Sequence, residues 1–212
     1  MVHTSFIDDL EKRLQEPLPG LAVLLKMAPP SRPIDFNLPD NVRKGGVLAL
    51  LYPHEGKLHT VFMLRTKDGG KHSGQVSFPG GKHEKTDPDF TYTALREAEE
   101  ELGIPHNEVR VLGQLSYIYI NPSNFLVYPT VGYLPYRPNF VPDPTEVAAI
   151  IEADIPYLMQ DDIQGIRPMP MTGNPKVKIK VPSFLVKGHV IWGATSMMLL
   201  ELLTVLKEVD LK

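Results

Sequence analysis

A glycine loop followed by a carboxylate-rich segment, residues 80–104, constrains the fold of this chain more than any other feature. The sequence GGKHEKTDPDFTYTALREAEEELGI predicts a helix of about four turns directly after the glycines. We expect Asp87 to be its N-cap, Pro88 its first helical residue and Gly103 its stop. The segment therefore predicts a loop-to-helix unit around which the remaining strands and helices are arranged.

Three glutamates lie on one face of this predicted helix. Glu97, Glu100 and Glu101 stand at i, i+3 and i+4, so their side chains fall within one arc of the helix surface. Like charges at this spacing repel each other, by about 0.2–0.5 kcal/mol per pair in an isolated helix. Carboxylates are the ligands that Mg²⁺ and Mn²⁺ prefer. A solvated acidic face is the alternative, and the preceding glycine loop favours the metal site.

Residues 96–104, REAEEELGI, resemble the second half of the Nudix box, which is written G-x5-E-x7-R-E-U-x-E-E-x-G-U with U aliphatic. Every fixed position of that half is filled. The first half departs, because Asp87 stands where the box has its first glutamate and eight residues rather than seven separate it from Arg96. Asp87 is thus either a metal ligand or only a helix cap, and we expect the cap.

The resemblance to the Nudix hydrolases implies both a fold and a reaction. The fold is α/β, with a mixed β-sheet sandwiched between helices (α/β/α). The reaction is hydrolysis of a diphosphate bond with Mg²⁺ or Mn²⁺, held by Glu97, Glu100 and Glu101. Arg96 is expected to orient Glu97 through an ion pair.

Residues upstream of the box are similar to a motif of the coenzyme A (CoA) pyrophosphatase branch of this family. The motif falls on residues 64–81, and its matching residues are Leu64, Arg65, His72, Gly74, Phe78, Pro79, Gly80 and Gly81. Thr66 and Gly70 depart from the residue types of that motif, and residues 191–195, IWGAT, are also similar to that branch. The resemblance implies CoA or acyl-CoA as substrate, with phosphopantetheine and adenosine 3′,5′-bisphosphate as products.

Several of these residues are candidates for substrate binding. Arg65 follows a predicted strand beside the glycine loop, where an arginine suits either a phosphate or a surface salt bridge. His72 either contacts substrate or has no role beyond its loop. Arg65, Lys71 and His72 are the candidates by position for the 3′-phosphate of CoA, which ADP-ribose lacks. Gly80 and Gly81 are expected to let the backbone approach the metal and phosphates closely.

The candidate general base is Glu146. It follows a loop with four prolines, residues 135–145, and precedes a predicted strand. A carboxylate there could accept a proton from the attacking water, although capping a loop end is the commoner role for such a residue. One of the box glutamates is the alternative base. Trp192 is the only tryptophan, and we expect a core position for it rather than stacking on adenine.

The apolar periodicity predicts the remaining elements. Helices are expected at 3–16, 156–159 and 193–209, and strands at 46–52, 58–64, 109–120, 125–134, 147–153 and 176–181. Prolines predict an irregular segment at 18–39. We therefore divide the chain into an N-terminal helix with a proline-rich wrapping segment, 1–44, and a Nudix hydrolase domain, 45–212.

Composition excludes several classes of function. The net charge is −3 and the basic residues are scattered, which argues against nucleic acid and anionic membranes as partners. The absence of cysteine excludes disulfides, thiolate metal sites and thiol nucleophiles. No apolar stretch is long enough to span a bilayer and no signal-peptide pattern is present, so we expect a cytoplasmic protein. The expected partner is a small-molecule diphosphate, and a homodimer is left open.

Two alternatives to CoA hydrolysis remain. ADP-ribose, a nucleotide sugar or a dinucleoside polyphosphate could be the substrate of the same fold. A non-catalytic nucleotide-binding domain is the other alternative. Such a domain would be free to lose a metal ligand, and all three carboxylates are present.

Overall fold

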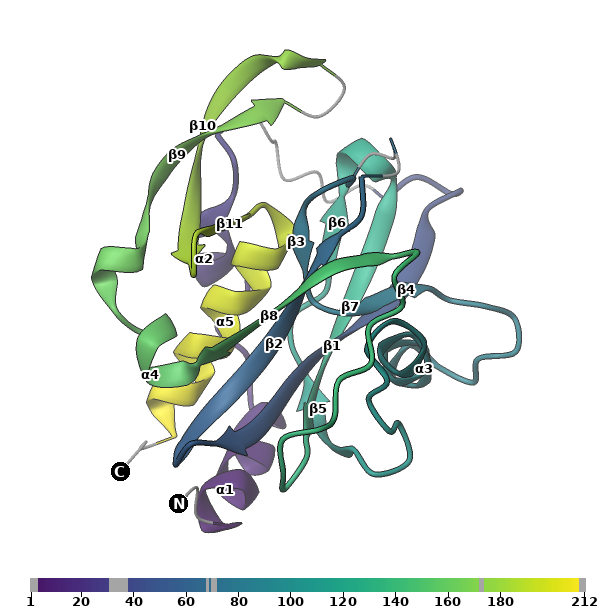
Figure 1. Cartoon of the computed structure of the whole chain (residues 1–212), viewed down its shortest axis with the longest axis vertical. Coiled ribbons are helices and arrows are strands. Elements are labelled where there is room, and N and C mark those ends of the chain that lie inside the picture. The colour runs from purple at the N-terminus through teal and green to yellow at the C-terminus, as the bar shows by residue number, and fades with distance from the viewer. Residues whose placement is uncertain (1–3, 31–37, 68, 70–71, 172–173, 210–212) are drawn as a thin grey trace.

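The computed structural model describes residues 4–30, 38–67, 69, 72–171 and 174–209 (Figure 1). Its main strands are β1 (Arg43–His54), β2 (Lys57–Arg65), β3 (Val76–Ser77), β4 (Gly80–Lys82), β5 (Arg110–Gln114), β6 (Ile118–Ile120), β7 (Phe125–Tyr133) and β8 (Val147–Asp154). Within the described residues they form an eight-stranded sheet with the path β3-β2-β1-β7-β5, to which β4, β6 and β8 are paired. β1 pairs parallel with β7 and antiparallel with β2, so the sheet is mixed, as expected.

Helices cover both faces of this sheet. They are α1 (Thr4–Leu14), α2 (Leu21–Leu24), α3 (Phe90–Leu102), α4 (Ile155–Leu158) and α5 (Ala194–Glu208). α3 lies on one face and α5 on the other (Figure 1). Successive side chains of a strand point to opposite faces, so Leu48, Leu50 and Tyr52 of β1 pack with α3, whereas Ala49 and Leu51 pack on the α5 side. The α/β/α sandwich is therefore confirmed.

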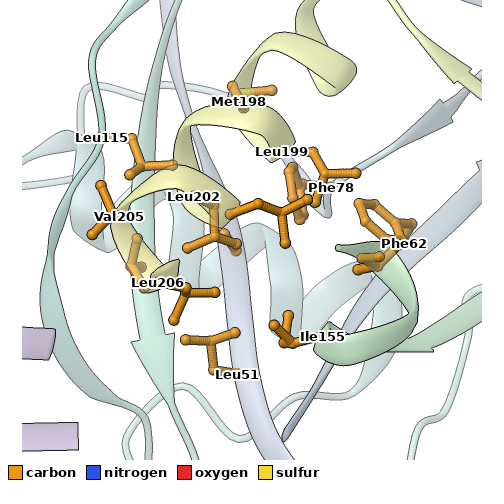
Figure 2. Packing of buried hydrophobic residues seen from close by; sticks show 14 of the residues in the cluster. Leu51, Phe62, Phe78, Leu115, Ile155, Met198, Leu199, Leu202, Val205 and Leu206 are labelled. Atoms are coloured by element: carbon orange, nitrogen blue, oxygen red, sulfur yellow. The ribbon is translucent and has the colours of Figure 1, made fainter. Parts of the chain in front are cut away.

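The larger hydrophobic cluster lies on the α5 side of the sheet. Figure 2 shows Leu199, Leu202 and Leu206 of α5 directed towards Leu51 of β1 and Ile155 of α4. These five side chains are fully buried. Burying one leucine side chain contributes about 1.5–3 kcal/mol. This cluster therefore fixes α5 against the sheet.

Among the described residues, no helix has the length and apolar character needed to cross a bilayer.

A second sheet extends beyond the main sheet near the start of α5 (Figure 1). Within the described residues it has three antiparallel strands, β9 (Gln164–Met171), β10 (Asn174–Val186) and β11 (His189–Trp192), in the order β11-β10-β9. Phe184, Val186 and Ile191 of this sheet are fully buried and join the core on the α5 side. The second sheet is therefore packed onto the main domain.

The structure confirms most of the predicted elements and corrects others. The helices expected at 3–16, 156–159 and 193–209 form, as do the strands at 46–52, 58–64, 125–134 and 147–153. The single strand predicted for 109–120 is wrong, because the chain leaves the ladder between β5 and β6. There Ser116 donates its N–H and its hydroxyl to the Glu201 carboxylate.

Prolines led to three further errors. The strand predicted to stop at Pro182 continues to Val186, where it pairs with β11. β9 was not predicted because it contains Pro168 and Pro170, and it forms an edge strand, where proline is tolerated. Residues 18–39 were expected to be irregular, yet α2 and a short 3-10 helix (Leu25–Met27) lie within them. Residues 31–37 lie outside the described residues, and the division into 1–44 and 45–212 stays a prediction.

Candidate active site

The glycine loop joins β3 to α3 through β4. Gly80 and Gly81 pair with Val47 and Gly46 of β1, which holds the loop against the sheet. Gly80 has a φ of 149°, and a Cβ atom there would lie 2.3 Å from the carbonyl oxygen of Gly46. A Cβ atom on Gly81 would lie 2.5 Å from the carboxylate of Glu97. Only glycine fits at position 80, where a side chain would clash with the backbone of β1, and a side chain at position 81 would displace the Glu97 carboxylate. The backbone of the loop therefore approaches the carboxylate face of α3 closely.

The helix boundaries differ from the prediction at one end. α3 ends at Gly103, whose φ of 68° places it in the left-handed region, as expected. Its N-cap is Asp89, which accepts a hydrogen bond from the Tyr92 N–H at 2.7 Å. The prediction that Asp87 caps the helix and Pro88 begins it is therefore wrong.

Asp87 instead forms a buried ion pair with Arg96. Its two oxygens lie 3.0 Å from Nε and 3.0 Å from Nη2 of Arg96, and they also accept from the Glu84 N–H and the Thr93 hydroxyl. These contacts, led by the hydrogen bonds from Arg96, lower the pKa of Asp87 well below its usual range. The side chain is 1% exposed. Its hydrogen-bonding capacity is engaged within the protein, which argues for positioning Arg96 rather than for metal binding.

Arg96 connects Asp87 to two of the predicted metal ligands. Its Nη2 lies 3.1 Å from Oε1 of Glu97 and its Nη1 lies 2.9 Å from Oε2 of Glu100. The ion pair between Arg96 and Glu97 that the resemblance implies is thus present. Asp87 holds one side of the guanidinium while the other side orients the two glutamates.

Glu101 is the most deeply buried carboxylate of the site, with 2% of its surface exposed. Its Oε2 accepts a hydrogen bond from the Gly80 N–H at 2.7 Å, and its Oε1 lies 3.5 Å from Nη1 of Arg65. Burial raises its pKa to about 8, with the charges of Glu97 and Glu146 acting in the same direction and the Gly80 and Arg65 contacts opposing them. Burial, with smaller contributions from neighbouring carboxylates, also raises the pKa of Glu97. A cation here would be favoured because it relieves both effects.

Arg65 brings Glu146 to the same site. Its Nη2 lies 3.7 Å from Oε2 of Glu146, whose side chain is about half exposed, and the Thr66 N–H donates to the Glu146 carbonyl. The candidate base Glu146 thus lies near Glu101, and Arg65 stands between their two carboxylates. The ring of His72 lies nearby and its Nδ1 is 3.1 Å from Oε1 of Gln75. Gly70 and Lys71 lie outside the described residues.

A cavity of about 1040 Å³ adjoins the carboxylates. Arg65, Gly80 and Gly81 line the cavity and also contact the glutamates of α3, so they connect the two. Its other walls come from the main sheet, the start of α5 and the second sheet, and include Arg43, Val47, Lys82, Phe125, Val127, Met171, Ile179, Trp192, Thr195 and Met198. Arg43, Lys82 and Phe125 were not predicted as site residues, since none of them occupies a fixed position of a local motif. Trp192, expected in the core, is only partly buried and lines this cavity.

The fold and the site together define the class of protein. The family model for the NUDIX domain matches residues 42–154, more than half of the chain. The chain belongs to the Nudix family, and it is a Nudix hydrolase.

Known proteins support this assignment. The chain is 33% identical over 178 residues to an uncharacterized Nudix hydrolase NudL from Photorhabdus laumondii, covering 84% of this chain and 90% of the relative. It is 34% identical over 188 residues to the human mitochondrial coenzyme A diphosphatase NUDT8, covering 88% and 73%. A MutT/nudix family protein from Enterococcus faecalis shares the fold, with a TM-score of 0.54, 13% identity and coverage of 98% and 76%.

Nudix hydrolases generally use divalent metals such as Mg²⁺ or Mn²⁺. Within the described residues, no three carboxylate or histidine side chains are already gathered for coordination. The contacts explain this, since Arg96 holds one oxygen each of Glu97 and Glu100. The donor set nevertheless fits, because it consists of hard carboxylate oxygens on one helix face and includes two carboxylates whose pKa is raised by burial.

Proposed function

We propose that this protein hydrolyses the diphosphate bond of CoA or an acyl-CoA in the presence of Mg²⁺ or Mn²⁺. The products would be phosphopantetheine and adenosine 3′,5′-bisphosphate. The observation that carries the proposal is the continuity between the carboxylate face of α3 and the cavity, through Arg65, Gly80 and Gly81. The relationship to a human coenzyme A diphosphatase and the motif around Arg65 favour CoA over other diphosphates.

The residues of the site have distinct roles in this mechanism. Glu97, Glu100 and Glu101 would hold the divalent metal, which when bound neutralises diphosphate charge and makes a nearby water more acidic. Arg96, fixed by Asp87, orients the first two of these glutamates. The role of the arginine is therefore positioning.

Three further residues act on the substrate side. Gly80 and Gly81 keep side chains away, so that the diphosphate can approach the carboxylate face. Arg65 lies between that face and the cavity, where its guanidinium can bind diphosphate oxygens.

Glu146 is the proposed general base. Water attacks phosphorus, its proton passes to the carboxylate, and the phosphorus–oxygen bond of the diphosphate breaks. The partly exposed side chain beside Arg65 can move towards the reacting phosphate. Turnover by Glu146→Gln equal to that of the wild type would assign the base to one of the box glutamates instead.

A substrate screen tests the proposal. CoA, acetyl-CoA, dephospho-CoA, ADP-ribose, a nucleotide sugar and a dinucleoside polyphosphate would each be incubated with Mg²⁺ or Mn²⁺, and the products separated by chromatography. We expect CoA or acetyl-CoA to have the highest kcat/KM, and excess EDTA to abolish turnover. Faster cleavage of ADP-ribose would leave the general diphosphatase function, and binding without turnover would favour the non-catalytic alternative.

Two expectations stay predictions. One is the cytoplasmic location, and the other is the homodimer that the sequence leaves open. Size-exclusion chromatography with light scattering measures the second directly.

A further inference from the structure

Arg43 lies at the start of β1, on the face of the strand that borders the cavity. Val47 lies four residues later, pairs with Gly80 and also lines the cavity. Residues two and four apart on a strand share a face, so the side chain of Arg43 points to the same side as that of Val47. In the parallel register Arg43 pairs with Phe125, and both line the cavity.

The contacts of Arg43 hold its guanidinium without neutralising it. Its Nη2 donates to the Ser123 carbonyl at 2.6 Å, and Cζ lies 5.6 Å from the centre of the Phe125 ring. Within the part of the chain that the structure describes, no carboxylate pairs with Arg43. An arginine has five N–H donors, so most of its capacity can serve a ligand in the cavity.

Arg65, the other arginine among the described residues that line the cavity, is in the opposite situation. Its two terminal nitrogens lie 3.5 Å from Glu101 and 3.7 Å from Glu146. Its charge is therefore shared by two carboxylates of the site. Lys82 adds positive charge on the Arg43 side, because it lines the cavity and its backbone pairs with Gly45, between Arg43 and Val47.

We propose that Arg43 binds the 3′-phosphate of CoA and thereby determines specificity for 3′-phosphorylated substrates. This inference rests on the proposed function. The Cα atoms of Arg43 and Val47 are separated by about 13 Å along the strand, and an arginine side chain extends over part of that distance. The 3′-phosphate of CoA lies across the ribose from its diphosphate, so it needs a cation displaced from the glycine loop. A guanidinium is well suited to a phosphate because it can donate two parallel hydrogen bonds.

The test compares kcat/KM for CoA and dephospho-CoA, which differ only in the 3′-phosphate. We expect the wild type to prefer CoA by about 10-fold or more, and Arg43→Ala to bring this ratio close to one. Arg43→Gln removes the charge but keeps a donor for the Ser123 carbonyl, so it covers the case in which Arg43→Ala folds poorly. Arg43→Lys should keep an intermediate ratio.

Two control variants sharpen the test. Lys44→Ala removes a positive charge from the next residue of β1, whose side chain faces away from the cavity, and should keep the wild-type ratio. Arg65→Ala should slow both substrates together, because Arg65 contacts the carboxylate site. An unchanged ratio in Arg43→Ala and Arg43→Gln, or no preference for CoA in the wild type, would overturn the role of Arg43 while leaving the diphosphatase function intact. No cleavage of either compound by the wild type would overturn the proposed function and this inference together.

Discussion

Glu101 and Glu201 are both buried glutamates, and they lie on helices that cover opposite faces of the same sheet. Glu201 of α5 is fully buried, and its carboxylate accepts hydrogen bonds from the Gly20 N–H at 2.8 Å and from the N–H and hydroxyl of Ser116 at 2.9 and 2.7 Å. Glu101 of α3 has one short hydrogen bond, from the Gly80 N–H, and an arginine at 3.5 Å.

This difference in hydrogen-bond partners distinguishes Glu201, a carboxylate that joins segments of the fold, from Glu101, a proposed metal ligand. Glu201 joins the N-terminal segment and the link between β5 and β6 to α5, and three protein donors bind its two oxygens. Glu101 has fewer donors and faces the charges of Glu97 and Glu146. Burial alone therefore does not identify a functional carboxylate, whereas its hydrogen-bond partners and neighbouring charges do.

The largest expected effect is on catalysis by Glu101→Gln. We expect kcat with saturating Mn²⁺ to fall at least about 10²-fold, because one of the proposed ligands of the metal loses its charge. The fold should persist, since glutamine keeps the size of the side chain and cannot ionise beside Glu97 and Glu146. Thermal unfolding and turnover of the same preparation measure both, and wild-type turnover would remove Glu101 from the metal ligands.

The matching substitution Glu201→Gln should affect stability instead. Its amide N–H₂ would face the N–H donors of Gly20 and Ser116, so the free energy of unfolding should fall by about 2–4 kcal/mol. Urea denaturation of the wild type and the variant measures this loss. We expect turnover per folded molecule to be kept, because Glu201 lies on the face of the sheet opposite the α3 carboxylates and does not line the cavity. An unchanged urea midpoint would contradict the structural role.

The pH dependence of stability provides a finer test of the environment of Glu101. The pKa of Glu101 is raised to about 8 in the folded protein. The protonated side chain therefore stabilises the fold fully at a pH below the pKa of Glu101 in the unfolded chain, and this stabilisation is lost as the pH rises through 8. In metal-free buffer, Glu101→Gln should therefore gain stability relative to the wild type between pH 5 and pH 9, by at least about 1 kcal/mol. Urea denaturation at the two pH values measures the difference, and a constant difference would show that Glu101 does not titrate in this range.

The smallest effect expected concerns the start of α3. Asp89→Ala removes the hydrogen bond to the Tyr92 N–H and should lower the free energy of unfolding by about 1 kcal/mol. Asp162→Ala, at an exposed aspartate in a 3-10 helix, is the control and should change it by less than about 0.5 kcal/mol. Equal losses in the two variants would mean that Asp89 does not act as the cap.

The parts of the site that were predictable from the sequence depend on local spacing. The arc of Glu97, Glu100 and Glu101 follows from helical periodicity alone, and Gly103 is a local stop signal. The N-cap was misassigned because Asp87 is drawn into a buried pair with Arg96, a contact that the spacing of cap residues does not reveal.

The remaining features depend on contacts between distant segments. Arg43 reaches the cavity through the parallel register of β1 with β7, 82 residues later at Phe125, which no local pattern encodes. The strand predicted for 109–120 is interrupted where Ser116 donates to Glu201, which lies 85 residues later in the sequence. The strand that contains Pro168 and Pro170, β9, forms because β10 pairs with it, whereas local propensity alone would exclude a strand there.

We expect the carboxylates of α3, and not buried carboxylates in general, to hold the metal of this hydrolase. Calorimetric titration of Mn²⁺ into the wild type, Glu101→Gln and Glu201→Gln, at one pH above 8 where Glu101 is ionised, tests it most directly. We predict that Glu101→Gln weakens Mn²⁺ binding at least about 10-fold, equivalent to about 1.4 kcal/mol, and that Glu201→Gln binds like the wild type. Equal Mn²⁺ affinity in the wild type and Glu101→Gln would contradict the account.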